Sequence, residues 1–285
     1  MRKINAYTLA QKRTAMEKDT QHEVSQKPIE FNIWEGIFPN FESAEEVKLE
    51  DGFSSQRYIT QARKVATESL LAISEKRKIP LFHKQRFTLL PITVSFLLSL
   101  KKEIHILDFG GGLGIGYMNC LESIPNANQK ITYDIVELEE VCKEGIVFSE
   151  ENNLSVLYSN ALPNNKCFDL IFCSSALQYI KDWKNLINQF SQTGASKILL
   201  SDVFCGNFPK SFATIQNYYE SKIPHWFFST SDLVNEFQKN GYELALQTEA
   251  TGKRAGKDDF LPMSNFPKSH QIETTSHLLF SKLKA

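Results

Sequence analysis

From residue 104 to the end of the chain, short apolar runs alternate with stretches of helical spacing. The runs predict strands over 104–109, 131–138, 154–159, 168–175, 197–204, 241–249 and 276–283. The stretches between them predict helices near 114–124, 139–152, 180–193 and 230–240. Such alternation is typical of a mostly parallel sheet covered by helices on both faces. Because only a loop separates the last two runs, we expect them to pair antiparallel, in a Rossmann-like, doubly wound α/β sheet of seven strands.

Glycines gather directly after the first predicted strand, in the stretch ILDFGGGLGIG. Open α/β sheets bind ligands beyond the C-terminal ends of their strands, where glycine permits a tight turn and close ligand approach. The dinucleotide spacing GxGxxG is not met, because Ile115 and Tyr117 occupy the sixth positions. No Gly-Lys-Ser/Thr follows, which excludes a Walker loop. The spacing that fits is D-x-G-x-G-x-G, made by Asp108, Gly110, Gly112 and Gly114.

This spacing resembles motif I of the class I S-adenosylmethionine-dependent methyltransferases. The resemblance implies that Gly110 and Gly112 let the turn pass against the methionine and ribose parts of that cofactor. It also implies that Asp108 orients the loop amides or meets the amino acid part. Gly111 lies in the same turn and is a further candidate for cofactor binding. Because Gly111 and Gly116 fall outside the pattern, we expect alanine there to weaken binding less than at Gly110 or Gly112.

The ends of the second and third predicted strands supply the next candidates. A ribose has two vicinal hydroxyls, and an ionised carboxylate accepts hydrogen bonds from both. Glu137 ends its apolar run and is the expected ribose ligand, whereas Asp134, on the opposite face inside the strand, is the weaker alternative. At the end of the third strand, the resemblance places Asn160 and Ala161 beside the adenine.

The stretch CSSALQYI (173–180) follows the fourth predicted strand and is expected beside the sulfonium. Ser174 and Ser175 are cofactor-binding candidates, and Gln178 and Tyr179 are candidates for the acceptor. A serine cap that merely starts a helix is an alternative of nearly equal weight.

The segment before helix 230–240 carries candidates for the acceptor side of the site. Aromatic rings stack on sugar faces, so Tyr219 and Trp226 are candidate acceptor ligands, with packing in a lid or dimer surface as the alternative. His225 and Asp202 are the candidate general bases. A general base helps when the methyl acceptor is a hydroxyl, and it is less necessary for an amine that arrives neutral. The histidines form no ligand cluster, so we expect no metal.

A narrower resemblance rests on WEGIFPNFESAEEV (34–47) and on IPHWFF within residues 218–244. The chain resembles a methyltransferase family often associated with bacterial surface-polysaccharide gene clusters. This resemblance implies S-adenosylmethionine as cofactor and a hydroxyl or amine of a small molecule, sugar or glycan precursor as acceptor. The alternative is a non-catalytic module that binds the cofactor and scaffolds a polysaccharide synthesis complex. A net charge of -1 argues against a nucleic-acid substrate.

The remaining expectations concern organisation. We expect a flexible arm over 1–28, a helical cap over 29–102 with helices at 54–78 and 88–101, and a methyltransferase domain over 103–285 with an acceptor-side insert at about 205–229. The longest apolar stretch, 87–100, is interrupted by Pro91 and too short to span a bilayer. The five cysteines are an odd number without zinc spacing, which favours free thiols in the cytoplasm. The oligomeric state is left open.

Overall fold

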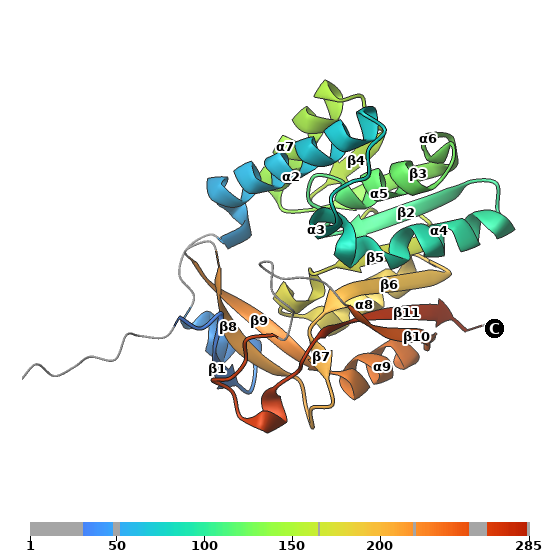
Figure 1. Ribbon diagram of the computed structural model, residues 1–285. Helices are drawn as coiled ribbons and strands as arrows, with labels where there is room; N and C mark the ends of the chain where they lie inside the picture. The colour runs from blue at the N-terminus through green and yellow to red at the C-terminus, as the bar shows by residue number, and fades with distance from the viewer. Residues whose placement is uncertain (1–30, 48–51, 165, 219–220, 251–260, 284–285) are drawn as a thin grey trace, which may run out of the picture. The chain divides into compact units, whose positions relative to one another are not determined.

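The computed structural model describes residues 31–47, 52–164, 166–218, 221–250 and 261–283 (Figure 1). The expected arm over 1–28 lies outside these residues. In the described part, the largest sheet has seven strands in the order β10-β11-β6-β5-β2-β3-β4. Their bounds are β2 (Ile104–Phe109), β3 (Ile131–Val136), β4 (Val156–Ser159), β5 (Leu170–Ser174), β6 (Lys197–Val203), β10 (Tyr242–Ala250) and β11 (Thr275–Lys282).

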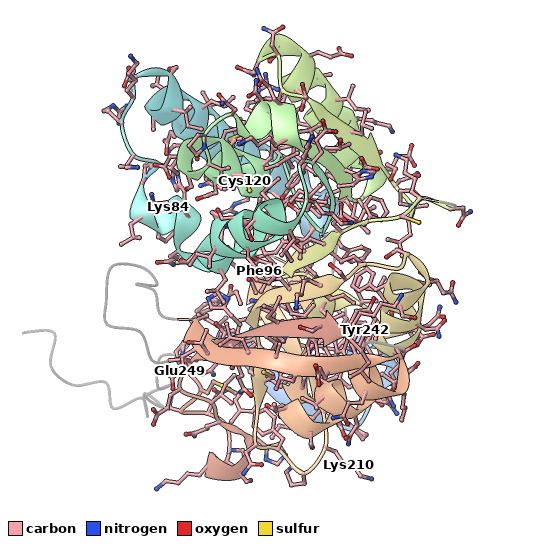
Figure 2. All side chains as sticks on the ribbon, turned by 90° about the vertical axis from the view of Figure 1, so that its right-hand side faces the viewer. Lys84, Phe96, Cys120, Lys210, Tyr242 and Glu249 are labelled. Carbon is pink, nitrogen blue, oxygen red and sulfur yellow. The ribbon has the colours of Figure 1, made fainter. Side chains whose placement is uncertain are left out.

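The strand order confirms the predicted doubly wound sheet. β2, β3, β4, β5 and β6 pair in parallel, whereas β11 runs antiparallel to both β6 and β10. The chain proceeds outward from β2 through β3 to β4 and then returns to β5 on the other side of β2. This reversal places a ligand crevice at the C-terminal ends of β2 and β5. Figure 2 shows β10 along its length, with Tyr242 and Glu249 near its ends.

Helices cover both faces of this sheet, because alternate strand residues point to opposite sides. In β2, Ile106 packs with residues of α4 and α5 on one face, and Leu107 packs with residues of α8 and α9 on the other. The helix bounds are α4 (Leu89–Leu100), α5 (Ile115–Ser123), α6 (Ala127–Lys130), α7 (Glu139–Glu151), α8 (Trp183–Gln192) and α9 (Thr230–Lys239). Among the described residues, no helix combines the length and apolar content needed to cross a membrane.

A second sheet of four strands, in the order β1-β8-β9-β7, was not expected. β8 (Phe212–Tyr218) and β9 (Ser221–Ser229) form an antiparallel hairpin, and β7 (Cys205–Gly206) pairs with β9. β1 (Trp34–Phe38) pairs with β8, so the segment 29–102 contributes a strand as well as helices. Its helices are α1 (Phe41–Glu45), α2 (Gln56–Ser74), α3 (Leu81–Lys84) and α4. The expected insert at about 205–229 is therefore the centre of a sheet that the N-terminal segment completes (Figure 1).

Candidate functional site

The glycine turn leaves β2 at the centre of the sheet and leads into α5. Gly110, Gly112 and Gly114 have φ angles of +73°, +55° and +82°, a region that side chains with a Cβ rarely adopt. A Cβ on Gly110 would lie 2.4 Å from the Cβ of Ala176. A Cβ on Gly112 would have no neighbour closer than the Tyr58 hydroxyl, at 3.9 Å. The turn therefore packs tightly against the end of β5 but leaves space in front of Gly112.

Asp108 lies beneath the turn, against Gly111, and bonds to no turn amide among the described residues. Its side chain is buried, and Oδ2 accepts a 2.7 Å hydrogen bond from the Tyr133 hydroxyl. Its Oδ1 has no hydrogen-bond partner among the described residues. The pKa of Asp108 is raised to about 7, mainly by burial; the bond from Tyr133 lowers it and the negative charge of Glu137 raises it.

Gly111 and Gly116 are packed against this buried pair. A Cβ on Gly111 would lie 2.7 Å from Asp108 Cγ. A Cβ on Gly116 would lie 2.4 Å from the Tyr133 hydroxyl and 2.9 Å from Asp108 Oδ2. Contacts this short force neighbouring atoms to move, so both positions have a structural need for glycine that the motif spacing does not reveal. The reason is space for Asp108 rather than space for a ligand.

Glu137 follows β3, next to the turn. Its Oε1 accepts a 2.9 Å hydrogen bond from the Gly112 amide, and its Oε2 accepts one of 2.9 Å from the Leu138 amide. Burial raises the pKa of Glu137, and these two backbone bonds act in the opposite direction. The alternative acid, Asp134, is buried and bonded instead to His105 and Lys166, at 2.9 and 2.7 Å. The structure thus brings Glu137, and not Asp134, to the glycine turn.

The neighbouring strand end carries the adenine candidates. Asn160 and Ala161 directly follow β4 and are exposed. The Ser159 hydroxyl donates a 2.8 Å hydrogen bond to the Ala161 carbonyl, and the Ser159 carbonyl accepts one of 3.1 Å from the Glu137 amide. These contacts place both candidates at the same sheet edge as Glu137.

Ser175 and Asp202, which the sequence assigns to different roles, form one hydrogen-bonded pair. Ser175 directly follows β5, and Asp202 lies in β6, one residue before its end. The Ser175 hydroxyl donates a hydrogen bond to Asp202 Oδ2. Thr275 donates a 2.5 Å hydrogen bond to Asp202 Oδ1. Ser175 and Asp202 each have a φ of +53°, a strained conformation for residues other than glycine. Ser174 is buried, and its hydroxyl has no partner among the described residues.

The acceptor candidates lie between β5 and the four-stranded sheet. Gln178 is 0% exposed, and neither polar atom of its amide has a partner among the described residues. The Tyr179 hydroxyl donates a 2.7 Å hydrogen bond to Gln216, and burial raises its pKa. His225 is fully buried, with its ring centroid 5.2 Å from that of Tyr179 and 4.6 Å from that of Phe204.

Two further acceptor candidates have different outcomes. Trp226 donates a 3.2 Å hydrogen bond to the Ile180 carbonyl and stacks on Phe41 with ring centroids 5.6 Å apart. This ring therefore serves packing between the second sheet and the chain after β5. Tyr219 lies outside the described residues.

Three residues near the turn were not singled out in the sequence. They are Tyr58 of α2, Tyr133 of β3 and Arg86, which precedes α4. In the sequence, Tyr133 looks like an ordinary core residue of its strand. Tyr58 and Arg86 precede the first strand of the seven-stranded sheet, so no motif of that sheet includes them. Within the described ranges, no group of three or more His, Cys, Asp or Glu side chains is arranged to hold a metal ion.

Several solved structures resemble this chain at low sequence identity. Solved structures of similar fold include an S-adenosylmethionine-dependent methyltransferase from Clostridium acetobutylicum, with 13% identity, a TM-score of 0.46, and coverage of 70% of this chain and 92% of that one. Magnesium protoporphyrin IX methyltransferase from Synechocystis with bound SAM has 12% identity, a TM-score of 0.46 and coverage of 70% and 81%. A 1,6-didemethyltoxoflavin-N1-methyltransferase from Burkholderia thailandensis has 11% identity, a TM-score of 0.48 and coverage of 83% and 94%.

The family assignment rests on the sequence. No curated protein sequence matches the chain. The family described as a methyltransferase domain matches residues 82–247, which is more than half of the 285 residues. The matched region contains the glycine turn, Glu137 and the strained pair. The chain therefore belongs to the methyltransferase domain family.

Proposed function

We propose that this protein transfers a methyl group from S-adenosylmethionine to a hydroxyl or amine of a small molecule, sugar or glycan precursor. The observation that carries the proposal is the meeting of the glycine turn and the Glu137 carboxylate at the ends of neighbouring strands, joined by the 2.9 Å Gly112–Glu137 bond. A turn of this kind at the topological switch point binds a ligand through its backbone, and a carboxylate beside it suits a ribose diol.

The residues present fit this cofactor. Space is open in front of Gly112, and a carboxylate already accepts from the turn at the position where a diol would donate. Asn160 and Ala161 would line the adenine end, and Ser174 and Ser175 the sulfur end. When bound, the sulfonium supplies an electrophilic methyl group and a neutral thioether leaving group.

The work of the protein is then mainly positioning, because the leaving group is already good. For a hydroxyl acceptor, His225 and Asp202 are the proposed proton acceptors. Asp202 is linked to the turn through Ser175 and its neighbour Ala176, and His225 borders Tyr179. The amide of Gln178 has no partner among the described residues, which supports a role for it in holding polar groups of the acceptor.

Binding of S-adenosylhomocysteine, measured by titration calorimetry, tests the cofactor. We expect wild-type protein to bind it with a dissociation constant of micromolar order. Glu137→Gln replaces one carboxylate oxygen by a donor, so affinity should fall at least about tenfold. Glu139→Gln is the matched control, because Glu139 is an exposed acid that pairs only with Lys143 among the described residues.

Two results would contradict the proposal. The first is no heat of binding with the wild-type protein, and the second is equal affinity of the Glu137→Gln variant. Methyl transfer to a panel of hydroxyl and amine acceptors, followed by mass spectrometry, then separates the enzyme from the scaffold. Binding without turnover on any acceptor, together with a stable protein partner, would favour the scaffold.

A further inference from the structure

Arg86 places a guanidinium beside Ser175 and Asp202, at the ends of β5 and β6. Its Nη1 is 3.4 Å from Ser175 Oγ, and its Nε is 3.8 Å from Asp202 Oδ2. A bidentate arginine–carboxylate pair has N–O distances of about 2.7–2.9 Å, so the contact with Asp202 is not such a fork. The Arg86 side chain is 48% exposed. Ser175 and Asp202 therefore contact the guanidinium through Nη1 and Nε, and about half of the Arg86 side chain stays exposed to a ligand.

The backbone of Arg86 is fixed at this place. Arg86 is the central residue of the 3-10 turn η2 (Gln85–Phe87), which contacts β6. The next residue, Phe87, packs against Phe172 of β5, with ring centroids 5.8 Å apart. Thr88 closes the turn by donating a 2.6 Å hydrogen bond to the Gln85 carbonyl. The guanidinium is thus carried by a segment anchored on the two strands that end at the site.

The partners of Arg86 are themselves held in strained conformations. Ser175 and Asp202 both have a φ of +53°, a backbone conformation that is unfavourable for residues with a Cβ. Residues held in such conformations cluster at ligand sites, where the surrounding structure enforces them. Ala176, next to Ser175, has its Cβ only 2.4 Å from the Cβ position of Gly110. The strained pair is therefore joined through Ala176 to Gly110, the first glycine of the turn.

We propose that Arg86 is the receptor for a carboxylate at this end of the site. The inference rests on the proposed function. A planar guanidinium with two parallel N–H groups matches a carboxylate in geometry and charge. Two molecules can bring one here: the cofactor, through its amino acid end, or an acidic methyl acceptor. The chemistry of recognition is the same for both, and the probes below distinguish them.

The test compares two ligands that differ at the amino acid end. S-adenosylhomocysteine has a carboxylate and an ammonium group, and 5′-methylthioadenosine has the same nucleoside and sulfur but neither charge. If the cofactor supplies the carboxylate, Arg86→Gln should weaken S-adenosylhomocysteine at least about tenfold and leave 5′-methylthioadenosine within about twofold. Arg86→Lys should fall between, because it keeps the charge but loses the fork. Unchanged binding of 5′-methylthioadenosine also shows that the variant is folded.

If the acceptor supplies the carboxylate, both nucleosides should bind the variant as they bind wild type. Benzoate should then bind the complex with S-adenosylhomocysteine more tightly than benzamide, and Arg86→Gln should abolish the difference. Arg77→Gln is the control, since Arg77 forms an exposed ion pair with Glu75. Equal binding of every probe by wild type and Arg86→Gln would overturn the inference. Failure of wild type to bind S-adenosylhomocysteine would instead refute the proposed function itself.

Discussion

Alanine at Gly116 is expected to destabilise the protein, against the usual effect of this substitution in a helix. Gly116 lies in α5, where alanine normally stabilises by about 1 kcal/mol relative to glycine. Here the new methyl group would lie 2.4 Å from the Tyr133 hydroxyl, 2.9 Å from Asp108 Oδ2 and 3.2 Å from Leu90 Cδ2. All three neighbours are buried. The substitution therefore overpacks the space under the turn.

The magnitude follows from three contributions. Overpacking of a core costs about 1–3 kcal/mol. Moving the Tyr133 hydroxyl weakens its 2.7 Å bond to Asp108, and loss of a hydrogen bond to a charged group costs about 1.5–3 kcal/mol. The gain in helix propensity offsets about 1 kcal/mol of this. We expect the free energy of unfolding to fall by about 2–5 kcal/mol.

Urea unfolding of the variant and of two companions measures this effect. Gly112→Ala is the matched control in the same turn, because its Cβ would meet no atom within 3.9 Å and its cost comes from the left-handed backbone, about 1–2 kcal/mol. Tyr133→Phe removes the hydroxyl that the new methyl group meets. Gly116→Ala combined with Tyr133→Phe should therefore be at least about 1 kcal/mol more stable than the sum of the single changes predicts.

Two results would refute this reasoning. One is a Gly116→Ala variant that unfolds at the same urea concentration as wild type or at a higher one. The other is strict additivity with Tyr133→Phe, which would mean that the methyl group and the hydroxyl do not compete for the same space.

Two further predictions concern buried groups. Burial raises the pKa of Asp108 to about 7, above the value of about 3.9 for an unfolded carboxyl, so the folded state keeps a proton that the unfolded state releases. The free energy of unfolding should consequently fall as the pH rises from about 4 to about 7. Asp108→Asn should shrink the difference in urea midpoint between pH 5 and pH 8. An undiminished difference would contradict the raised pKa of Asp108. Of the five cysteines, Cys167 is exposed and the other four are buried, so a thiol reagent should label one site per folded chain. Cys167→Ser should remove that labelling, and rapid labelling that persists would show that a buried cysteine becomes accessible.

Hydrophobic periodicity was enough to place the sheet and most of its helices. The strand predicted over 104–109 is β2 without any change of bounds. The second prediction, 131–138, ends two residues late, because β3 stops at Val136 and the Glu137 side chain then accepts hydrogen bonds from the amides of Gly112 and Leu138. The helix predicted from 180 starts at Trp183, where the Asp182 side chain caps the Asn185 amide at 3.2 Å. These errors lie at element ends, where caps and turns decide the boundary.

Hydrophobic periodicity could not predict the second sheet, because its strands β1 and β8 are far apart in the sequence. Trp34 of β1 lies opposite Gln216 of β8, so no local pattern links the two strands. β9 contains Pro224, which is unusual within a strand, followed by a run of aromatic side chains. Such a run lacks the alternation of apolar and polar residues that identifies a half-buried strand. Only the fold brings these segments together, and it places the ring of His225 next to that of Trp34. The indole nitrogen of Trp34 has no hydrogen-bond partner among the described residues.

The glycine turn shows most clearly what spacing alone leaves out. Its pattern treats each glycine as a place for the ligand, and that interpretation suits Gly112, which faces open space. Gly111 and Gly116 serve a different need, because they leave room for Asp108 and its bond to Tyr133. Asp108 is buried beneath the turn, where its carboxylate accepts a hydrogen bond from Tyr133. A substitution under the turn should therefore lower stability first and affinity as a consequence, whereas one at Gly112 or Glu137 should lower affinity directly.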